Sequence, residues 1–221
     1  MATWGYVRPE KQTVGDRRLR GKRGTSRIRL QGVSHTRCVS PSPQPASPEQ
    51  RLIIISGEEG AGKSTIVRAL LPSTPYGARI DAEDIGQTNP CPMDDAFFDL
   101  LRRNVAGLVE NFWAAGYVNV IAGSFLRRYS DYVSFRQLLR PSAVFLIDLL
   151  VDKEVRDHRR ITRAKRTTQE WRDMVDQVPE DRTIRRATDA DYRYIGIDTT
   201  DLDVGGTVQR IKGAIPEVYA G

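Results

Sequence analysis

The chain has 221 residues, 39% of them hydrophobic, which is enough for one α/β domain with its own core and a short appendage. Its net charge is +6, but residues 1–50 hold ten Lys/Arg and three Asp/Glu, and the remaining 24 basic and 25 acidic residues sum to −1. The basic excess therefore gives no support to nucleic-acid binding by the folded part, and no apolar run has the length of a membrane helix.

The first 49 residues are expected to be a basic leader followed by a Pro/Ser linker. Residues 1–39 lack a sustained apolar period, and residues 40–48 read SPSPQPASP, a composition typical of extended, disordered chain. We expect one folded domain over residues 50–221. Three interpretations of the leader stay open: a solvated tail, an extension upstream of the true start, and a targeting or RNA-contacting arm.

A nucleotide-binding motif opens the folded part. Four apolar residues, Leu52 to Ile55, precede a complete G-x-x-x-x-G-K-[S/T] loop, and a helix-like run follows it. The glycines of such a loop let backbone N–H groups point at phosphate oxygens, Lys63 can reach the β- and γ-phosphates, and Ser64 can bind Mg²⁺. The predicted nucleotide-binding residues are Gly57, Glu58, Glu59, Gly60, Ala61, Gly62, Lys63, Ser64 and Thr65.

The remaining elements predict an α/β fold in which short strands alternate with helices. The predicted strands are Leu52 to Ser56, Ala78 to Ala82, Tyr117 to Ala122, Ala143 to Leu150 and Tyr192 to Ile197. Apolar residues recur at helical spacing from Asp95 to Ala115, and Val204 to Val218 is expected to be a closing helix. Together with the phosphate loop, this pattern predicts a three-layer P-loop NTPase fold, with a five-stranded parallel sheet covered by helices on both faces.

Carboxylates gather where the second predicted strand ends. Asp81, Glu83 and Asp84 fall at the carboxyl edge of the sheet, beside the phosphate loop, where ligands bind in open α/β sheets. A carboxylate there could orient and deprotonate an acceptor hydroxyl, or hold Mg²⁺ together with Ser64, with Asp81 as the metal candidate. The alternative is that these acids cap the following turn.

An arginine-rich segment follows the fourth predicted strand. Arg156, Arg159, Arg160 and Arg163 are spaced so that a helix places them along one face. Such a face can close over a triphosphate and neutralise charge on the transferring phosphoryl group. The alternative is a solvated basic helix.

The third predicted strand lacks an acid that many phosphate-loop proteins carry at its end. It runs into Gly123 and Ser124, so metal binding would depend on Ser64, water and the acidic turn. Asp148 follows an apolar run in the next strand and is a secondary candidate for this role.

Taken together, these segments resemble the P-loop small-molecule kinases, the group that contains shikimate, gluconate and chloramphenicol kinases and the zeta-toxin-like sugar-nucleotide kinases. The resemblance rests on GEEGAGKST, the DAED turn, the arginine-rich segment and IDTTDLDV near the end, and it covers roughly Arg51 to Glu217. It implies that Asp81 or Asp84 serves the acceptor or the metal, and that the turn from Asp198 to Thr200 lies by the adenine. By the same resemblance, Lys63 contacts phosphates, Ser64 binds Mg²⁺, and Arg160 and Arg163 are lid residues.

We therefore expect a cytoplasmic enzyme that transfers the γ-phosphoryl group of Mg-ATP to a hydroxyl of a small molecule, without binding nucleic acid through its folded domain or entering a membrane. The two cysteines, Cys38 and Cys91, fit a reduced compartment. An ATPase or nucleotide switch acting on a protein partner, and an RNA-contacting module using the leader, are the alternatives. The acceptor and the oligomeric state are left open by the sequence.

Overall fold

The computed structural model describes residues 49–162, 168–169, 173, 177, 183–187 and 190–219. At its centre is a five-stranded parallel sheet in the order β2-β3-β1-β4-β5. The first strand is therefore the middle one, flanked by β3 and β4, which confirms the predicted parallel sheet. The strands are β1 (Arg51–Gly57), β2 (Gly77–Asp81), β3 (Asn119–Gly123), β4 (Ala143–Leu150) and β5 (Tyr192–Asp198).

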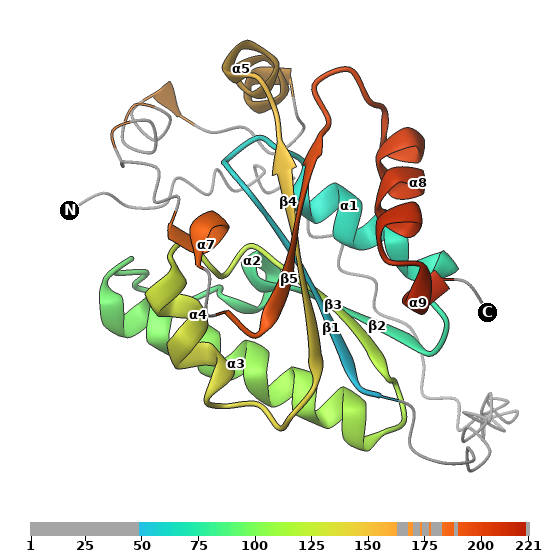
Figure 1. The fold of residues 1–221 in the computed structure, drawn as a ribbon. Coiled ribbons are helices and arrows are strands. Elements are labelled where there is room, and N and C mark those ends of the chain that lie inside the picture. The colour runs from blue at the N-terminus through green and yellow to red at the C-terminus, as the bar shows by residue number, and fades with distance from the viewer. Residues whose placement is uncertain are drawn as a thin grey trace, which may run out of the picture.

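Helices cover both faces of this sheet, as Figure 1 shows. On one side lie α1 and α8, which pack against each other, with α9 beside them; α3, α4 and α7 lie on the other. The helices of the first layer are α1 (Lys63–Leu70), η1 (Leu71–Ser73), α8 (Val204–Ala214) and α9 (Pro216–Tyr219). The remaining helices are α2 (Ala82–Ile85), α3 (Asp95–Ala114), α4 (Tyr129–Arg136), α5 (Lys153–Thr162) and α7 (Thr183–Arg186).

Two hydrophobic cores form because alternate residues of a strand point to opposite faces. Leu52 and Ile54 of β1 belong to the core under α3 and α4, whereas Ile53 and Ile55 belong to the core under α1 and α8. All four are at most 1% exposed, and burial of each such side chain stabilises the fold by roughly 1.5–3 kcal/mol. The continuous apolar run that predicted a strand is thus explained by burial on both faces.

Several predicted boundaries were wrong by one or more residues, and some helices were missed. The closing helix ends at Ala214, because Pro216 has no backbone N–H and disfavours helical geometry at Ile215; a separate short helix begins at the proline. The second strand ends at Asp81 rather than one residue later, because Asp81 caps α2. The missed helices are α2, α4 and α7, of which α4 is the longest.

The structure also bears on membrane insertion. Within the described ranges, no helix combines the length and the apolar character that crossing a bilayer requires.

Candidate functional site

The loop between β1 and α1 has the backbone geometry of a phosphate-binding loop. Gly60 and Gly62 have φ angles of +87° and +96°, in the left-handed region that side chains disfavour. A Cβ on Gly60 would lie 2.8 Å from the carbonyl oxygen of Arg156, so this position also needs the absence of a side chain. The loop is therefore shaped by glycine and lies directly against α5.

Lys63 is the first residue of α1, so its ammonium group lies at the positive end of that helix. Its Nζ atom donates hydrogen bonds to the carbonyl oxygens of Gly57 and Glu58, both at 2.9 Å. The side chain thus folds over the loop at the point where backbone N–H groups and the helix N-terminus favour an anion. Lys63 therefore lies over the loop, at the N-terminus of α1.

Asp81 joins the acidic turn to the phosphate loop. Its carboxylate, 5% exposed, accepts a hydrogen bond from the backbone N–H of Glu83 at 3.3 Å, and the Ser64 hydroxyl lies next to it. Burial raises the pKa of Asp81, the Ser64 hydroxyl opposes that shift, and the negative charge of Glu83 adds to it. Asp81 therefore caps α2, as the alternative interpretation had it, and also touches the predicted metal ligand.

The other two acids of the turn lie on α2 beside it. Asp84 is exposed and Glu83 is half-buried, and both carboxylates raise the pKa of Asp81 through their charge. In register, Asp81 pairs with Gly123 of β3, which in turn pairs with Ile55 of β1. The acidic turn, the end of β3 and the start of the phosphate loop therefore lie at one edge of the sheet.

The end of β3 has no room for the acid that the sequence lacks. A Cβ on Gly123 would lie 2.8 Å from Cγ2 of Val67 in α1, so a carboxylate side chain at this position would force the Val67 side chain or the strand to move. Ser124 follows with a φ of +68°, which is uncommon for a residue other than glycine. Its buried Oγ has no hydrogen-bond partner among the residues that the structure describes.

Helix α5 brings arginines to the phosphate loop. Arg156 forms an ion pair with Glu58, and the neighbouring Arg160 is only 2% exposed and packs beside Gly60 while pairing with Asp157. Hydrogen bonds from Lys153 and then from Arg160 lower the pKa of Asp157 to about 2. The first part of the predicted basic face, with Arg156 and Arg160, therefore contacts the phosphate loop. Arg163 lies outside the described residues.

The third arginine of this face points to the turn that follows β5. Arg159 Nη2 donates a hydrogen bond to the carbonyl oxygen of Thr199 at 3.2 Å. Within that turn, the backbone N–H of Thr200 donates to Asp198 at 3.0 Å, and this bond lowers the pKa of the Asp198 carboxyl. The turn from Asp198 to Thr200 therefore lies beside α5.

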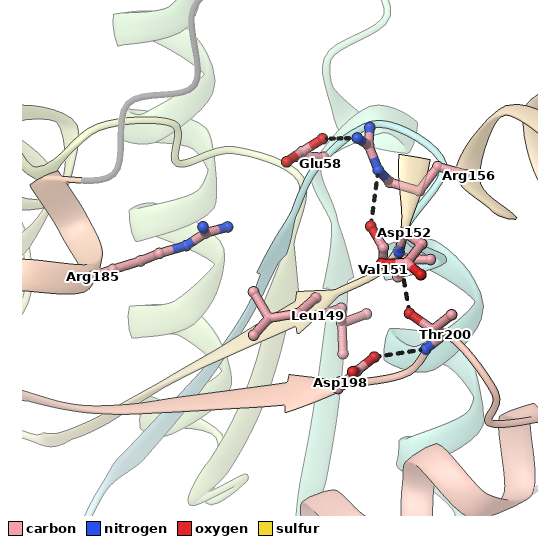
Figure 2. Close-up of a pocket in the computed structure, with 9 residues that line it drawn as sticks. Glu58, Leu149, Val151, Asp152, Arg156, Arg185, Asp198 and Thr200 are labelled. Carbon is pink, nitrogen blue, oxygen red and sulfur yellow. Dashed lines mark hydrogen bonds and ion pairs between the residues drawn. The ribbon is translucent and has the colours of Figure 1, made fainter. Parts of the chain in front are cut away.

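A pocket of about 200 Å³ opens between these elements, at the carboxyl ends of β4 and β5 (Figure 2). The phosphate loop, the start of α5 and the turn after β5 all contribute to it, and a helix outside the sequence motifs, α7, supplies a further cation. The lining residues are Glu58, Leu149, Leu150, Val151, Asp152, Arg156, Arg185, Asp198 and Thr200.

Arg185 was not predicted as a site residue. It enters the pocket from α7 and forms an ion pair with Asp148, whose carboxylate also accepts a hydrogen bond from the Tyr194 hydroxyl. The four-residue helix α7 is too short to show a period, so no sequence pattern marks Arg185. The same contacts give Asp148 two protein partners, which disfavours its secondary interpretation as a metal ligand.

Comparison with known proteins gives matches of fold but not of sequence. No protein-family model matches the chain, and no curated protein does. Solved structures match over more than three quarters of the chain.

A sugar kinase from Janibacter sp. HTCC2649 is 17% identical, with a TM-score of 0.60 over 78% of this chain and 98% of that one. A gluconokinase from Sinorhizobium meliloti 1021 is 13% identical, with a TM-score of 0.57 over 79% of this chain and 96% of that one. The Mycobacterium tuberculosis APS kinase, solved with AMPPNP and APS, is 10% identical, with a TM-score of 0.52 over 77% and 99%. The chain thus has the α/β fold of the P-loop small-molecule kinases, as the sequence motifs predicted.

Proposed function

We propose that this protein is an ATP-dependent kinase that moves the γ-phosphoryl group of Mg-ATP to a hydroxyl of a small molecule. The observation that carries the proposal is the position of the buried Asp81 at the sheet edge, next to the Ser64 hydroxyl of the phosphate loop. It places the phosphate loop, which would bind the donor ATP, beside the acidic turn that holds Glu83 and Asp84. The similarity of the fold to kinases supports the same reading.

The donor half would bind the triphosphate through the loop and its cations. Lys63 would exchange the carbonyl oxygens of Gly57 and Glu58 for phosphate oxygens, which are stronger acceptors because they are charged. Arg156 and Arg160, both in contact with the loop, would add positive charge near the transferring group. Arg163 keeps its predicted role at the phosphates as part of this proposal.

Ser64 and Asp81 fit a magnesium ion. Both offer oxygen atoms, Mg²⁺ prefers oxygen, and it keeps several water ligands when it bridges a protein to phosphates. Two protein oxygens are therefore enough, although the described residues hold no group of three or more metal-binding side chains. Bound there, the ion would neutralise charge on the phosphates.

The acceptor half would lie over the acidic turn. Asp81, Glu83 and Asp84 form the carboxylate group at this edge, next to the N-terminal half of α3. A carboxylate that accepts the hydroxyl proton would align the acceptor oxygen with the γ-phosphorus, and holding the two reactants together supplies most of the rate in phosphoryl transfer. The proposal includes a cytoplasmic location and a catalytic domain over residues 50–221.

A panel assay tests the proposal. ADP release is measured from Mg-ATP with a set of hydroxyl-bearing sugars, sugar acids, nucleosides and antibiotics. The Lys63→Ala protein, which loses the phosphate contact but keeps its buried core, serves as the blank. We expect at least one acceptor to raise ADP release in the wild type and none in Lys63→Ala. Full turnover by a folded Lys63→Ala protein would contradict the assignment.

A further inference from the structure

Asp148 is a buried carboxylate for which the proposed chemistry has no direct use. It lies near the end of β4 and is 3% exposed, and its neighbours in register, Ser56 and Gly196, have small side chains. Its Oδ2 atom accepts a hydrogen bond from Arg185 Nε at 2.5 Å and another from the Tyr194 hydroxyl at 3.0 Å. A buried charge is costly to desolvate, so its partners show what it holds in place.

The partner, Arg185, belongs to a segment 37 residues further along the chain and lines the same pocket as Glu58 and Arg156. Figure 2 shows its side chain extending from α7 into the pocket, between Glu58 and Leu149. Because Nε is held by Asp148, the plane of the guanidinium group is fixed. Its charged end is thereby directed to the pocket that Arg156 and Glu58 also line.

The helix that carries Arg185 is itself anchored to the core. The Tyr192 hydroxyl donates a hydrogen bond to the carbonyl oxygen of Ile184, and the backbone N–H of Tyr129 donates to the Thr183 hydroxyl at 3.3 Å. Ile184 is 6% exposed. α7 is therefore attached to both β5 and α4, and Arg185 extends from a fixed base.

We propose that Asp148 is a positioning residue, which acts through Arg185 to hold a further cation against the phosphate chain of the bound nucleotide. The inference rests on the proposed function, since it assumes a nucleotide in the phosphate loop. A guanidinium group matches the geometry of phosphate oxygens, and a donor that is already oriented needs no reorganisation when charge develops. Tyr194 completes the arrangement by fixing the carboxylate from β5.

A similar triad elsewhere in the molecule provides a control. Asp191 accepts hydrogen bonds from the Tyr132 hydroxyl and from Arg136 Nε, so it has the same types of partner as Asp148. Asp191 does not line the pocket. Its side chain is also more exposed, 53% against 4% for Asp148, so the stability of every variant is measured by thermal unfolding beside its affinity.

The experiment is a double-mutant cycle on nucleotide affinity in the full chain, with Mg²⁺ and a non-hydrolysable ATP analogue as the probe. We expect Asp148→Asn and Arg185→Ala each to weaken binding by roughly 10- to 100-fold, the range for hydrogen bonds to charged groups. In the Arg185→Ala background, Asp148→Asn should change the affinity by less than about twofold, because its effect passes through Arg185. Asp191→Asn should leave the affinity within about twofold of the wild type.

Unchanged affinity in a folded Asp148→Asn protein, or losses that add fully in the double variant, would overturn the proposal. Where Asp148→Asn does not fold, Tyr194→Phe removes one hydroxyl only; a weakening of about two- to fivefold supports the proposal, and unchanged affinity overturns it. The two proposals fail separately. A wild-type protein that does not bind the analogue refutes both, whereas binding that depends on Asp148 without any phosphorylated product refutes the kinase assignment alone.

Discussion

Asp81 links the two halves of the proposed site at the scale of single residues. It is buried, it contacts Ser64 of the phosphate loop, and it caps the helix on which Glu83 and Asp84 lie. Burial is the main reason that its pKa is raised. The proton that Asp81 binds at low pH therefore leaves at a higher pH than it would from an ordinary aspartate.

This shift predicts the acid limb of the pH profile. Whether Asp81 serves the acceptor or the metal, its protonated form is inactive, so kcat/KM should fall as the pH drops through a pKa above the ordinary 3.8. Asp81→Asn should lower kcat/KM by about 10²- to 10⁴-fold and remove that limb. The check is a kcat/KM profile from pH 4 to pH 8, with Asp191→Asn, outside the acidic turn, as the control that keeps the limb; an unchanged limb in Asp81→Asn would contradict it.

The same shift has a sign for stability. The folded protein binds this proton more tightly than the unfolded chain, so the contribution of Asp81 to stability is fully present below pH 3.8. It is lost as the pH rises through the raised pKa. The ionised form at neutral pH is therefore maintained at a cost in stability, which is typical of a functional carboxylate.

Individual residues differ in how well the sequence predicted them. Lys63 and Ser64 could be named as candidates from the sequence because the spacing of a phosphate loop is local and each of its positions has a fixed task. Arg185 and Tyr194 could not be predicted, because each acquires its role only when strands and helices distant in the sequence meet at Asp148. The missing acid after β3 has a packing reason, the contact with Val67, that only the fold shows.

At the scale of elements, the phosphate loop and α5 form one packed unit. Gly60 lies against the backbone of Arg156, and the side chain of Arg160 covers it. Gly62 has a similar left-handed φ but open space around the position of a Cβ. A substitution at Gly62 therefore costs stability through backbone strain alone, whereas one at Gly60 also costs the displacement of α5.

The two glycines give a matched pair of variants. Gly62→Ala should lower the free energy of unfolding by about 1–2 kcal/mol, the cost of a left-handed conformation for alanine. Gly60→Ala should lower it further, because the new methyl group would overlap the carbonyl oxygen of Arg156 at 2.8 Å. Urea unfolding without nucleotide checks the difference, and equal losses would show that α5 does not pack on the loop.

Elements were predicted well where hydrophobic periodicity or burial determines the secondary structure. Their ends were predicted less well where a capping side chain sets the boundary. The strands were found because buried parallel strands are runs of apolar residues, as Leu52 to Ile55 show. Their ends shifted by one or two residues, since a capping side chain such as Asp81 sets the boundary. Helix α4 was missed, although Tyr132, Phe135 and Leu139 of this region recur at helical spacing and are buried.

At the scale of the whole molecule, charge is divided between two parts. The first 50 residues carry the basic excess, and the remainder is close to neutral. The proposed chemistry therefore depends on a small number of cations at defined positions. Lys63, Arg156 and Arg185 lie around the phosphate loop. A site of this kind predicts recognition of one triphosphate rather than general affinity for polyanions.

Transfer of the γ-phosphoryl group itself is the most direct test of the kinase assignment. ATP labelled in this group is incubated with the protein, Mg²⁺ and the acceptor panel, and the label is then traced. We expect it in an organic phosphate ester, with little in inorganic phosphate and no ester formed by Lys63→Ala. Label found in inorganic phosphate alone, with release stimulated by a protein and by none of the small acceptors, would contradict the account and identify an ATPase.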